Sequence, residues 1–205
     1  MIQTKPKLLV ILALFSIFIF SSLILKAEET SLKITTVIGD VQFENTPVHA
    51  GDLISRAGSF SVADDTKSQV DILYPAGHKI RLKAGTKMSI AGEAQKFAKV
   101  LNLLNGKAYM HFQKKPDVPE FQIHTKTAVA GVRGTKFLIQ DYEGTSYLCV
   151  CEGSVAFSPI DKPDDARAVK SGEDLWLRPG KPFGQPKHSE AMSQSTTAEF
   201  KSMGD

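Results

Sequence analysis

The two cysteines are the residues whose spacing most directly suggests chemistry. Cys149 and Cys151 are separated by one residue in a run that alternates like a β-strand. On a strand, residues two apart share a face and lie about 6.5–7 Å apart, at or beyond the usual limit for a disulfide. We therefore favour two buried free thiols over a disulfide. The sequence supports a metal-binding role for the two cysteines even less, because no second cysteine pair or nearby histidine completes a site.

The five histidines offer one candidate metal pair. His111 and His124 would face each other if the segments 109–112 and 121–125 form paired strands, and two imidazoles are part of many metal sites. A metalloenzyme built on this pair is therefore an alternative to be tested. No acidic partner and no histidine four residues away accompanies either of them. We expect ordinary histidines and no bound metal.

None of the common catalytic motifs occurs in the sequence. It lacks a Gly-x-Ser-x-Gly nucleophile turn, a His-Glu-x-x-His zinc helix and a phosphate-binding glycine loop with its lysine. The acidic pairs Asp64-Asp65 and Asp164-Asp165 fall in turn-like segments, where we expect them to be solvated. The sequence therefore predicts no enzymatic activity and no cofactor.

The charge balance argues against nucleic-acid binding. The 205 residues carry 25 basic and 22 acidic side chains, but Lys5, Lys7 and Lys26 lie in the first 27 residues, which hold no acid. Residues 28–205 therefore have 22 groups of each sign and no net charge. Binding to a phosphate backbone needs clustered positive charge.

Residues 1–27 have the pattern of an export segment. Lys5 and Lys7 precede an uncharged apolar run over residues 8–25, which predicts a helix long enough to nearly span a membrane. Two interpretations remain open, a signal peptide cut after Ala27 or an uncleaved anchor in the inner membrane. Ala27 suits a cleavage site, whereas Leu25 suits it poorly. Either interpretation places the rest of the chain in the periplasm or cell envelope of a bacterium.

The remaining sequence predicts an all-β fold. From Ile34 onward, short alternating or β-branched runs are separated by Gly, Pro and Asp turns, as in the run Lys79–Lys83. About ten such runs predict an antiparallel sandwich or roll, preceded by the N-terminal apolar helix. We place the β domain at residues 35–178. Residues 179–205 are polar and rich in Pro, Gly and Ser, which predicts a disordered tail.

The most distinctive stretch is Thr127-Ala128-Val129-Ala130-Gly131-Val132-Arg133-Gly134-Thr135-Lys136-Phe137. It resembles the Val-Arg-Gly-Thr-x-Phe hallmark of the FecR-type domain. Val150-Cys151-Glu152-Gly153-Ser154-Val155 resembles the Val-x-Glu-Gly-x-Val element of that family. Further fragments match in order between Thr35 and Leu177, so the chain is identified as resembling a FecR domain over this range.

The resemblance implies a signalling-type module, with one departure. The best-known members carry a cytoplasmic anti-sigma segment before their membrane helix, and here seven residues precede the apolar run. We therefore expect an exported, stand-alone FecR-like domain that binds an envelope protein in signalling or envelope organisation. The alternative is a module that binds cell-wall glycan through exposed aromatic side chains. The aromatic residues considered for this role, which also fit a core, are Phe43, Phe112, Phe137, Tyr147, Phe157 and Trp176.

The motif residues have a structural and a binding interpretation. Gly134 predicts a kink where another backbone approaches closely, and Glu152-Gly153 predicts a hairpin with a bulge. Arg133 offers a fork of donors, which we expect to fix a loop against Asp52 or Glu152 and not to bind a ligand. The candidate site residues, structural or binding, are Val132, Arg133, Gly134, Thr135, Phe137, Glu152 and Gly153.

Overall fold

A computed structural model describes residues 31–90, 100–114, 120–185 and 190–204. In these residues sixteen strands form one continuous sheet, and one α-helix follows them near the C-terminus. The strands are β1 (Leu32–Ile38), β2 (Val41–Phe43), β3 (Thr46–Pro47), β4 (Leu53–Ile54), β5 (Gly58–Val62), β6 (Gln69–Tyr74), β7 (His78–Lys83), β8 (Lys87–Ile90), β9 (Val100–His111), β10 (Phe121–His124), β11 (Ala128–Val132), β12 (Lys136–Tyr142), β13 (Thr145–Glu152), β14 (Ser154–Pro159), β15 (Arg167–Lys170) and β16 (Asp174–Leu177). A 3₁₀ turn, Pro75–Gly77, links β6 to β7, and the helix is α2 (Glu190–Ser202).

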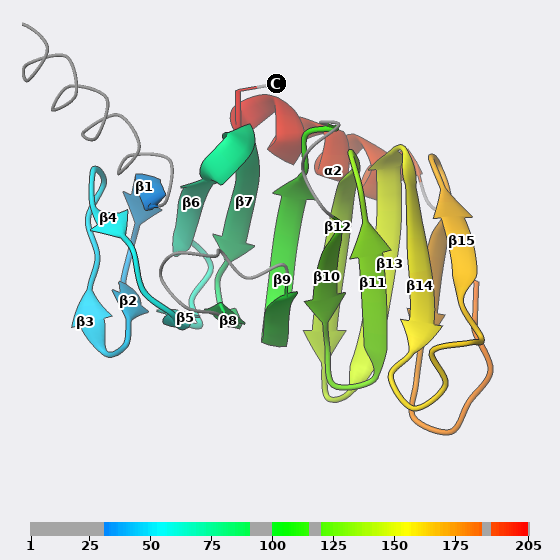
Figure 1. The fold of residues 1–205 in the computed structure, drawn as a ribbon. Coiled ribbons are helices and arrows are strands. Elements are labelled where there is room, and N and C mark those ends of the chain that lie inside the picture. The colour runs from blue at the N-terminus through cyan, green and yellow to red at the C-terminus, as the bar shows by residue number, and fades with distance from the viewer. Residues whose placement is uncertain (1–30, 91–99, 115–119, 186–189, 205) are drawn as a thin grey trace, which may run out of the picture.

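The long strand β9 belongs to two layers of this sheet. Its second part pairs with β7 and β12, which gives a layer in the order β4-β1-β6-β7-β9-β12-β13-β16 (layer A). Its first part pairs with β8 and β10, which gives the order β3-β2-β5-β8-β9-β10-β11-β14-β15 (layer B). In Figure 1 the strands β10, β11 and β14 stand in front of β12 and β13.

Gly106 lies where β9 passes from one layer to the other. Its φ is +99°, and an added Cβ would stand 2.5 Å from the Cα of Thr86. The Thr86 hydroxyl donates to the carbonyl of Lys107 and accepts the N–H of the same residue, each at 3.0 Å. A glycine is required here, because any side chain would collide with the backbone of the neighbouring strand.

The main core lies between the two layers. Alternation with a period of two turns Ile80 and Leu82 of layer A inward, and it does the same for Ile123 and Phe157 of layer B. Aromatic rings connect the layers at one end, where Phe112 lies 4.6 Å from Phe121 between ring centroids. A single continuous core of this kind is what makes the two layers one folding unit.

Helix α2 packs on the outer face of layer A (Figure 1). There Phe200 joins Tyr109, Leu138 and Cys149 in a second, smaller apolar cluster, with Met203 at its edge. The rings of Tyr109 and Phe200 meet edge to face, with centroids 5.8 Å apart. The molecule therefore has a third layer, formed by a single helix.

The predicted β architecture is confirmed, with corrections in its details. In the described part of the chain, 57% of the residues are in strands and 8% in helix, so the fold class is mostly β. The strands are more numerous than expected, and two of them, Thr46–Pro47 and Leu53–Ile54, are only two residues long. The β9–β10 pair is parallel, although an all-antiparallel arrangement was expected.

The expectation of a disordered tail over 179–205 does not hold for its last part. Residues 190–202 form α2, whose sequence contains good helix formers and whose Phe200 is buried against layer A. Packing of one apolar side chain thus orders a segment that composition alone marks as polar. The predicted N-terminal apolar helix lies outside the described residues. Within the described residues, no helix is long and apolar enough to cross a membrane.

Candidate functional site

The FecR-like motif forms a tight backbone corner between β11 and β12. Gly134 has a φ of +67°, and an added Cβ would lie 2.5 Å from the Cβ of Lys114 and 3.0 Å from its Cα. Gly153 has a φ of +89°, and its added Cβ would lie 2.9 Å from the carbonyl oxygen of Gly134. The close backbone approach expected at Gly134 is therefore present, and Gly153 is the residue that packs against it.

Three side chains of this corner point into the core. Val132 and Phe137 are buried, and so is Thr135, whose carbonyl accepts the N–H of Phe112 at 2.9 Å. The Thr135 hydroxyl has no hydrogen-bond partner among the described residues. The register of β12 and β13 shifts between Lys136 and Phe137, close to Glu152. The hairpin expected at Glu152-Gly153 is wrong, because β13 pairs with β12 and β16 whereas β14 pairs with β11 and β15. We call this region the motif corner: Val132–Thr135, Phe137, Glu152 and Gly153.

The expected contact of Arg133 with Asp52 or Glu152 is wrong. Asp52 accepts the backbone N–H of His49 at 2.8 Å, and Glu152 lies 3.2 Å from the ammonium of Lys136. Lys136 and Glu152 are register partners across β12 and β13, so Glu152 is already engaged by its own hairpin. Arg133 lies in the bend outside both strands and is exposed.

The two histidines considered as a metal pair do not face each other. The parallel pairing of β10 with the first part of β9 sets His124 opposite Asn102. His111 lies in the second part of β9, opposite residues of β7 and β12. Each histidine instead contacts a glutamine two residues away, at 3.1 Å for His124 and 3.2 Å for His111. Within the described segments, no group of three or more His, Cys, Asp or Glu residues is placed to hold a metal ion.

The cysteines are free, as favoured from their spacing, and both lie on the outer face of layer A. Cys149 is buried and Cys151 is half-buried. The hydrogen bond with Cys149, together with burial, raises the pKa of the Cys151 thiol above its usual range. The Cys151 thiol is therefore protonated at neutral pH.

The aromatic residues considered for glycan binding are mainly core residues. Phe43, Phe112, Phe137 and Phe157 are buried. Tyr147 donates its hydroxyl to Asp174 at 2.9 Å, and the guanidinium of Arg178 stacks 4.3 Å above the Trp176 ring. These six side chains do not form an exposed strip.

A row of positive charge runs along the outer face of layer A, beneath and beside α2. The alternation in Lys79-Ile80-Arg81-Leu82-Lys83 turns the two aliphatic residues into the core and the three cations outward. Arg81 is the register partner of Tyr109 on β9, and Lys107 lies two residues before Tyr109 on the same face. We call this surface the basic face: Lys79, Arg81 and Lys83 of β7, with Lys107 and Tyr109 of β9.

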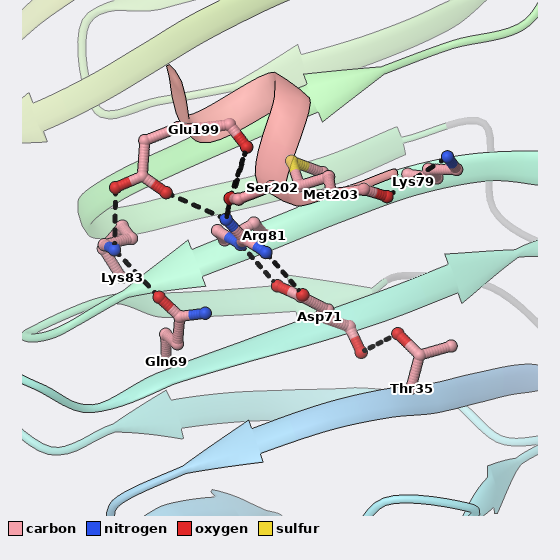
Figure 2. Close-up of polar contacts among 9 residues, drawn as sticks. All are labelled: Thr35, Gln69, Asp71, Lys79, Arg81, Lys83, Glu199, Ser202 and Met203. Carbon is pink, nitrogen blue, oxygen red and sulfur yellow. Dashed lines mark hydrogen bonds and ion pairs between the residues drawn. The ribbon is translucent and has the colours of Figure 1, made fainter. Parts of the chain in front are cut away.

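Arg81 is the centre of the basic face and is only 4% exposed. Its guanidinium binds Asp71 of β6 through two bonds, Nε to Oδ1 at 2.6 Å and the second nitrogen to Oδ2 at 2.7 Å. The third nitrogen donates to Glu199 Oε2 at 2.9 Å and to the hydroxyl of Ser202, both on α2. Figure 2 shows Arg81 lying between Asp71 and the helix. Such a bidentate carboxylate pair raises the pKa of Arg81 and stabilises its buried charge.

Two lysines complete the contact with α2. Lys83 Nζ donates to Glu199 Oε1 at 2.9 Å and to Gln69 Oε1 at 2.8 Å, while Lys79 Nζ donates to the carbonyl of Met203 at 3.2 Å (Figure 2). Lys79 Nζ also donates to the carbonyl of Gly204 at 2.7 Å. Burial alone would raise the pKa of Glu199, but the hydrogen bonds from Lys83 and Arg81 outweigh it and lower the pKa. Glu199 is therefore held as a carboxylate by two cations.

The helix leaves space on both sides of this contact. A cavity of about 570 Å³ is lined by Gln69 and Lys83 on the sheet and by Ser195, Glu199 and Ser202 on α2. A second cavity of about 370 Å³ lies near Lys79 and Met203. The contact is thus made by a few strong polar bonds and one aromatic pair. Sequence reasoning missed the basic face because it weighed total charge, although the alternation of Lys79–Lys83 was a usable signal.

Comparisons with known proteins agree with the motif. Residues 61–156 match the family model described as FecR protein. Two crystal structures of a "putative anti-sigma factor" from Parabacteroides distasonis ATCC 8503 share the fold, with TM-scores of 0.56 and 0.54 and identities of 18% and 17%. The alignments cover 70% and 69% of this chain, and this chain spans 64% of the length of each. A search of curated proteins gave no match.

The family match begins in β5 and ends in β14, so it includes β9 and the whole motif corner. The resemblance noted in the sequence is therefore confirmed over residues 61–156, which match the FecR family model.

Proposed function

We propose that this protein is an exported, non-enzymatic regulatory module of the cell envelope, which acts by binding a protein partner. The observation that carries the proposal is the FecR segment over residues 61–156. The fold shared with structures described as anti-sigma factors supports a role in signalling. The absence of catalytic motifs from the sequence supports binding as the mode of action.

The apolar run over residues 8–25 supports the proposed location. A basic start, a long uncharged segment and a small residue at position 27 are typical of export segments. On this proposal the FecR domain faces the periplasm, either free after cleavage or anchored to the inner membrane.

The test of location is the mass and fractionation of the native protein from its own cells. A soluble envelope protein that starts after Ala27, or a full-length protein in the inner membrane, would each support export. Recovery of the full-length chain in the cytoplasmic fraction would overturn it.

The test of partner binding is affinity capture of the tagged chain from its own envelope. The matched control is the Gly153→Val variant, in which the motif corner is disrupted. A protein that this variant also captures does not recognise the folded domain and is counted as background. We expect a protein enriched over this control. Enrichment of no protein, or retention on insoluble cell wall alone, would overturn protein binding, and the second outcome would favour the glycan alternative.

A further inference from the structure

We propose that the basic face is a helix-binding surface, which α2 occupies within its own chain until an acidic, amphipathic helix of the partner protein takes its place. This inference rests on the proposed function, since it assigns the surface and the chemistry by which the partner is bound.

The charges of the contact favour an occupant more acidic than α2. Beside the described part of α2, the sheet contributes the cations Arg81, Lys83 and Lys107 and the carboxylate of Asp71, while Lys79 has polar partners of its own at the end of the helix. The described part of α2 adds the carboxylate of Glu199, so three cations face two carboxylates at this contact. Positive charge therefore remains in excess at a partly buried contact, where opposite charges interact most strongly.

Lys107 is a further cation of the basic face. Burial first, and then repulsion from Lys83, lower the pKa of its ammonium, and the attraction of Glu199 offsets them only in part. A second carboxylate on the occupying helix would relieve the repulsion between these two lysines.

The packing of α2 is weak enough for exchange. In its described part, only Thr196 and Phe200 are buried, and Met203 packs at the edge of the apolar cluster. The helix has 13 residues, and isolated helices of this length are marginal in water. Release of α2 therefore sacrifices one aromatic contact and a few polar bonds, while the two-layer core stays intact.

The cavity beside α2 indicates where the additional carboxylates would lie. Ser195, Glu199 and Ser202 are spaced four and three residues apart, so they share one helix face, and all three line the cavity of about 570 Å³. Glutamates at the two serine positions would have room beside the cations of β7. The partner helix is thus expected to carry carboxylates at this spacing, with an aromatic residue directly after the central one, as Phe200 follows Glu199.

The probe for this surface is a synthetic peptide of residues 190–205 carrying Ser195→Glu and Ser202→Glu, here the acidic peptide. The matched control carries Ser195→Lys and Ser202→Lys. Binding is measured by fluorescence anisotropy to the full chain in mild detergent and to its Phe200→Ala variant, in which α2 is loosened. We expect the acidic peptide to bind the variant at least tenfold more tightly than the wild type, and the lysine peptide to bind neither.

A second measurement uses the native cysteines as reporters. Cys149 lies under Phe200 in the same apolar cluster, so Phe200→Ala is expected to raise its labelling rate by about tenfold or more, and the acidic peptide is expected to restore protection. If Phe200→Ala fails to fold, Glu199→Gln serves as the loosened variant, because it keeps the shape of the side chain.

Three outcomes would overturn the inference. The first is equal binding of the acidic and the lysine peptide, and the second is equal binding of the acidic peptide to the wild type and to the loosened variant. The third is a dimer of the loosened variant in light scattering, which would identify a second copy of the chain as the occupant. The proposed function fails separately. A captured envelope partner that the acidic peptide does not displace would refute only the helix-binding surface, whereas peptide binding without any captured partner would refute only the proposed role.

Discussion

The motif corner and the basic face differ in which part of the chain makes their contacts. The motif corner is made by backbone, with Gly134 and Gly153 packed so closely that neither has room for a side chain. The basic face is made by side chains, with Arg81 and Lys83 reaching from the sheet to a helix. The corner fixes where β11, β12 and β13 lie, whereas the face contacts a segment that can leave. A motif that defines a family can therefore be structural, while the adaptable surface lies on ordinary alternating strands.

Loss of the Asp71 carboxylate is expected to give the largest effect, because it leaves a buried guanidinium without its bidentate partner. We expect Asp71→Asn to lower the free energy of unfolding by about 3 kcal/mol, since removing one partner of a buried ion pair is strongly destabilising. Chemical denaturation of the two proteins measures this change in the free energy of unfolding. The control is Asp164→Asn in an exposed loop, which should change stability by less than about 0.5 kcal/mol. Equal stability of the two variants would mean that Glu199 alone satisfies Arg81.

The motif corner is tested by comparing two glycines with similar backbone angles. Gly153 and Gly172 have φ of +89° and +82°, but only Gly153 has neighbours within 4 Å of an added Cβ. We expect Gly172→Ala to cost about 1 kcal/mol from backbone strain. Gly153→Ala should cost about 2–3 kcal/mol, because it adds a clash with the Gly134 carbonyl. Thermal unfolding measures the loss of stability in both variants. An equal loss would mean that the clash with the Gly134 carbonyl does not contribute.

Loss of the Glu199 charge should loosen α2 while leaving the sheet folded. Glu199→Gln weakens the bonds to Arg81 and Lys83, and we expect a cost of about 1 kcal/mol to helix docking, since the carboxylate is partly exposed. Proteolysis at Lys201 should accelerate, with little change in the unfolding midpoint of the sheet. The control is Thr197→Gln at an exposed position of α2, which keeps the cleavage site and should leave helix docking and the cleavage rate unchanged. A cooperative loss of the whole fold in Glu199→Gln would show that α2 and the sheet form one unit.

Acid should produce the same loosening reversibly. The pKa of Glu199 is lowered in the folded protein, so its contribution is present above the ordinary glutamate value of about 4.3 and is lost as pH falls through the lowered value. We expect Cys149 labelling, in a buffer series with a reagent that reacts with protonated thiols, to rise below about pH 4. Glu199→Gln should flatten this dependence, and an unchanged profile in that variant would assign the transition to another group.

Local sequence patterns were sufficient for the strands and the motif corner. The alternation of Lys79–Lys83 and the glycines at 134 and 153 are encoded within a few residues, because side-chain direction on a strand and positive φ are local properties. The expected partner of Arg133 was wrong, and the facing of His111 and His124 that was considered as an alternative does not occur. Their neighbours depend on which strands pair, and β9 joins β10 in parallel through its first part alone.

By itself, the sequence determined the all-β class, the FecR resemblance, the free cysteines and the absence of net charge beyond residue 27. Only the tertiary structure decided that β9 belongs to two layers and that a polar C-terminal segment becomes a helix. Only there does Glu199 meet Arg81, 118 residues away in the chain. The physical reason is that long-range contacts are selected by the burial and pairing of whole layers, whereas composition and periodicity report only on the nearest neighbours along the chain.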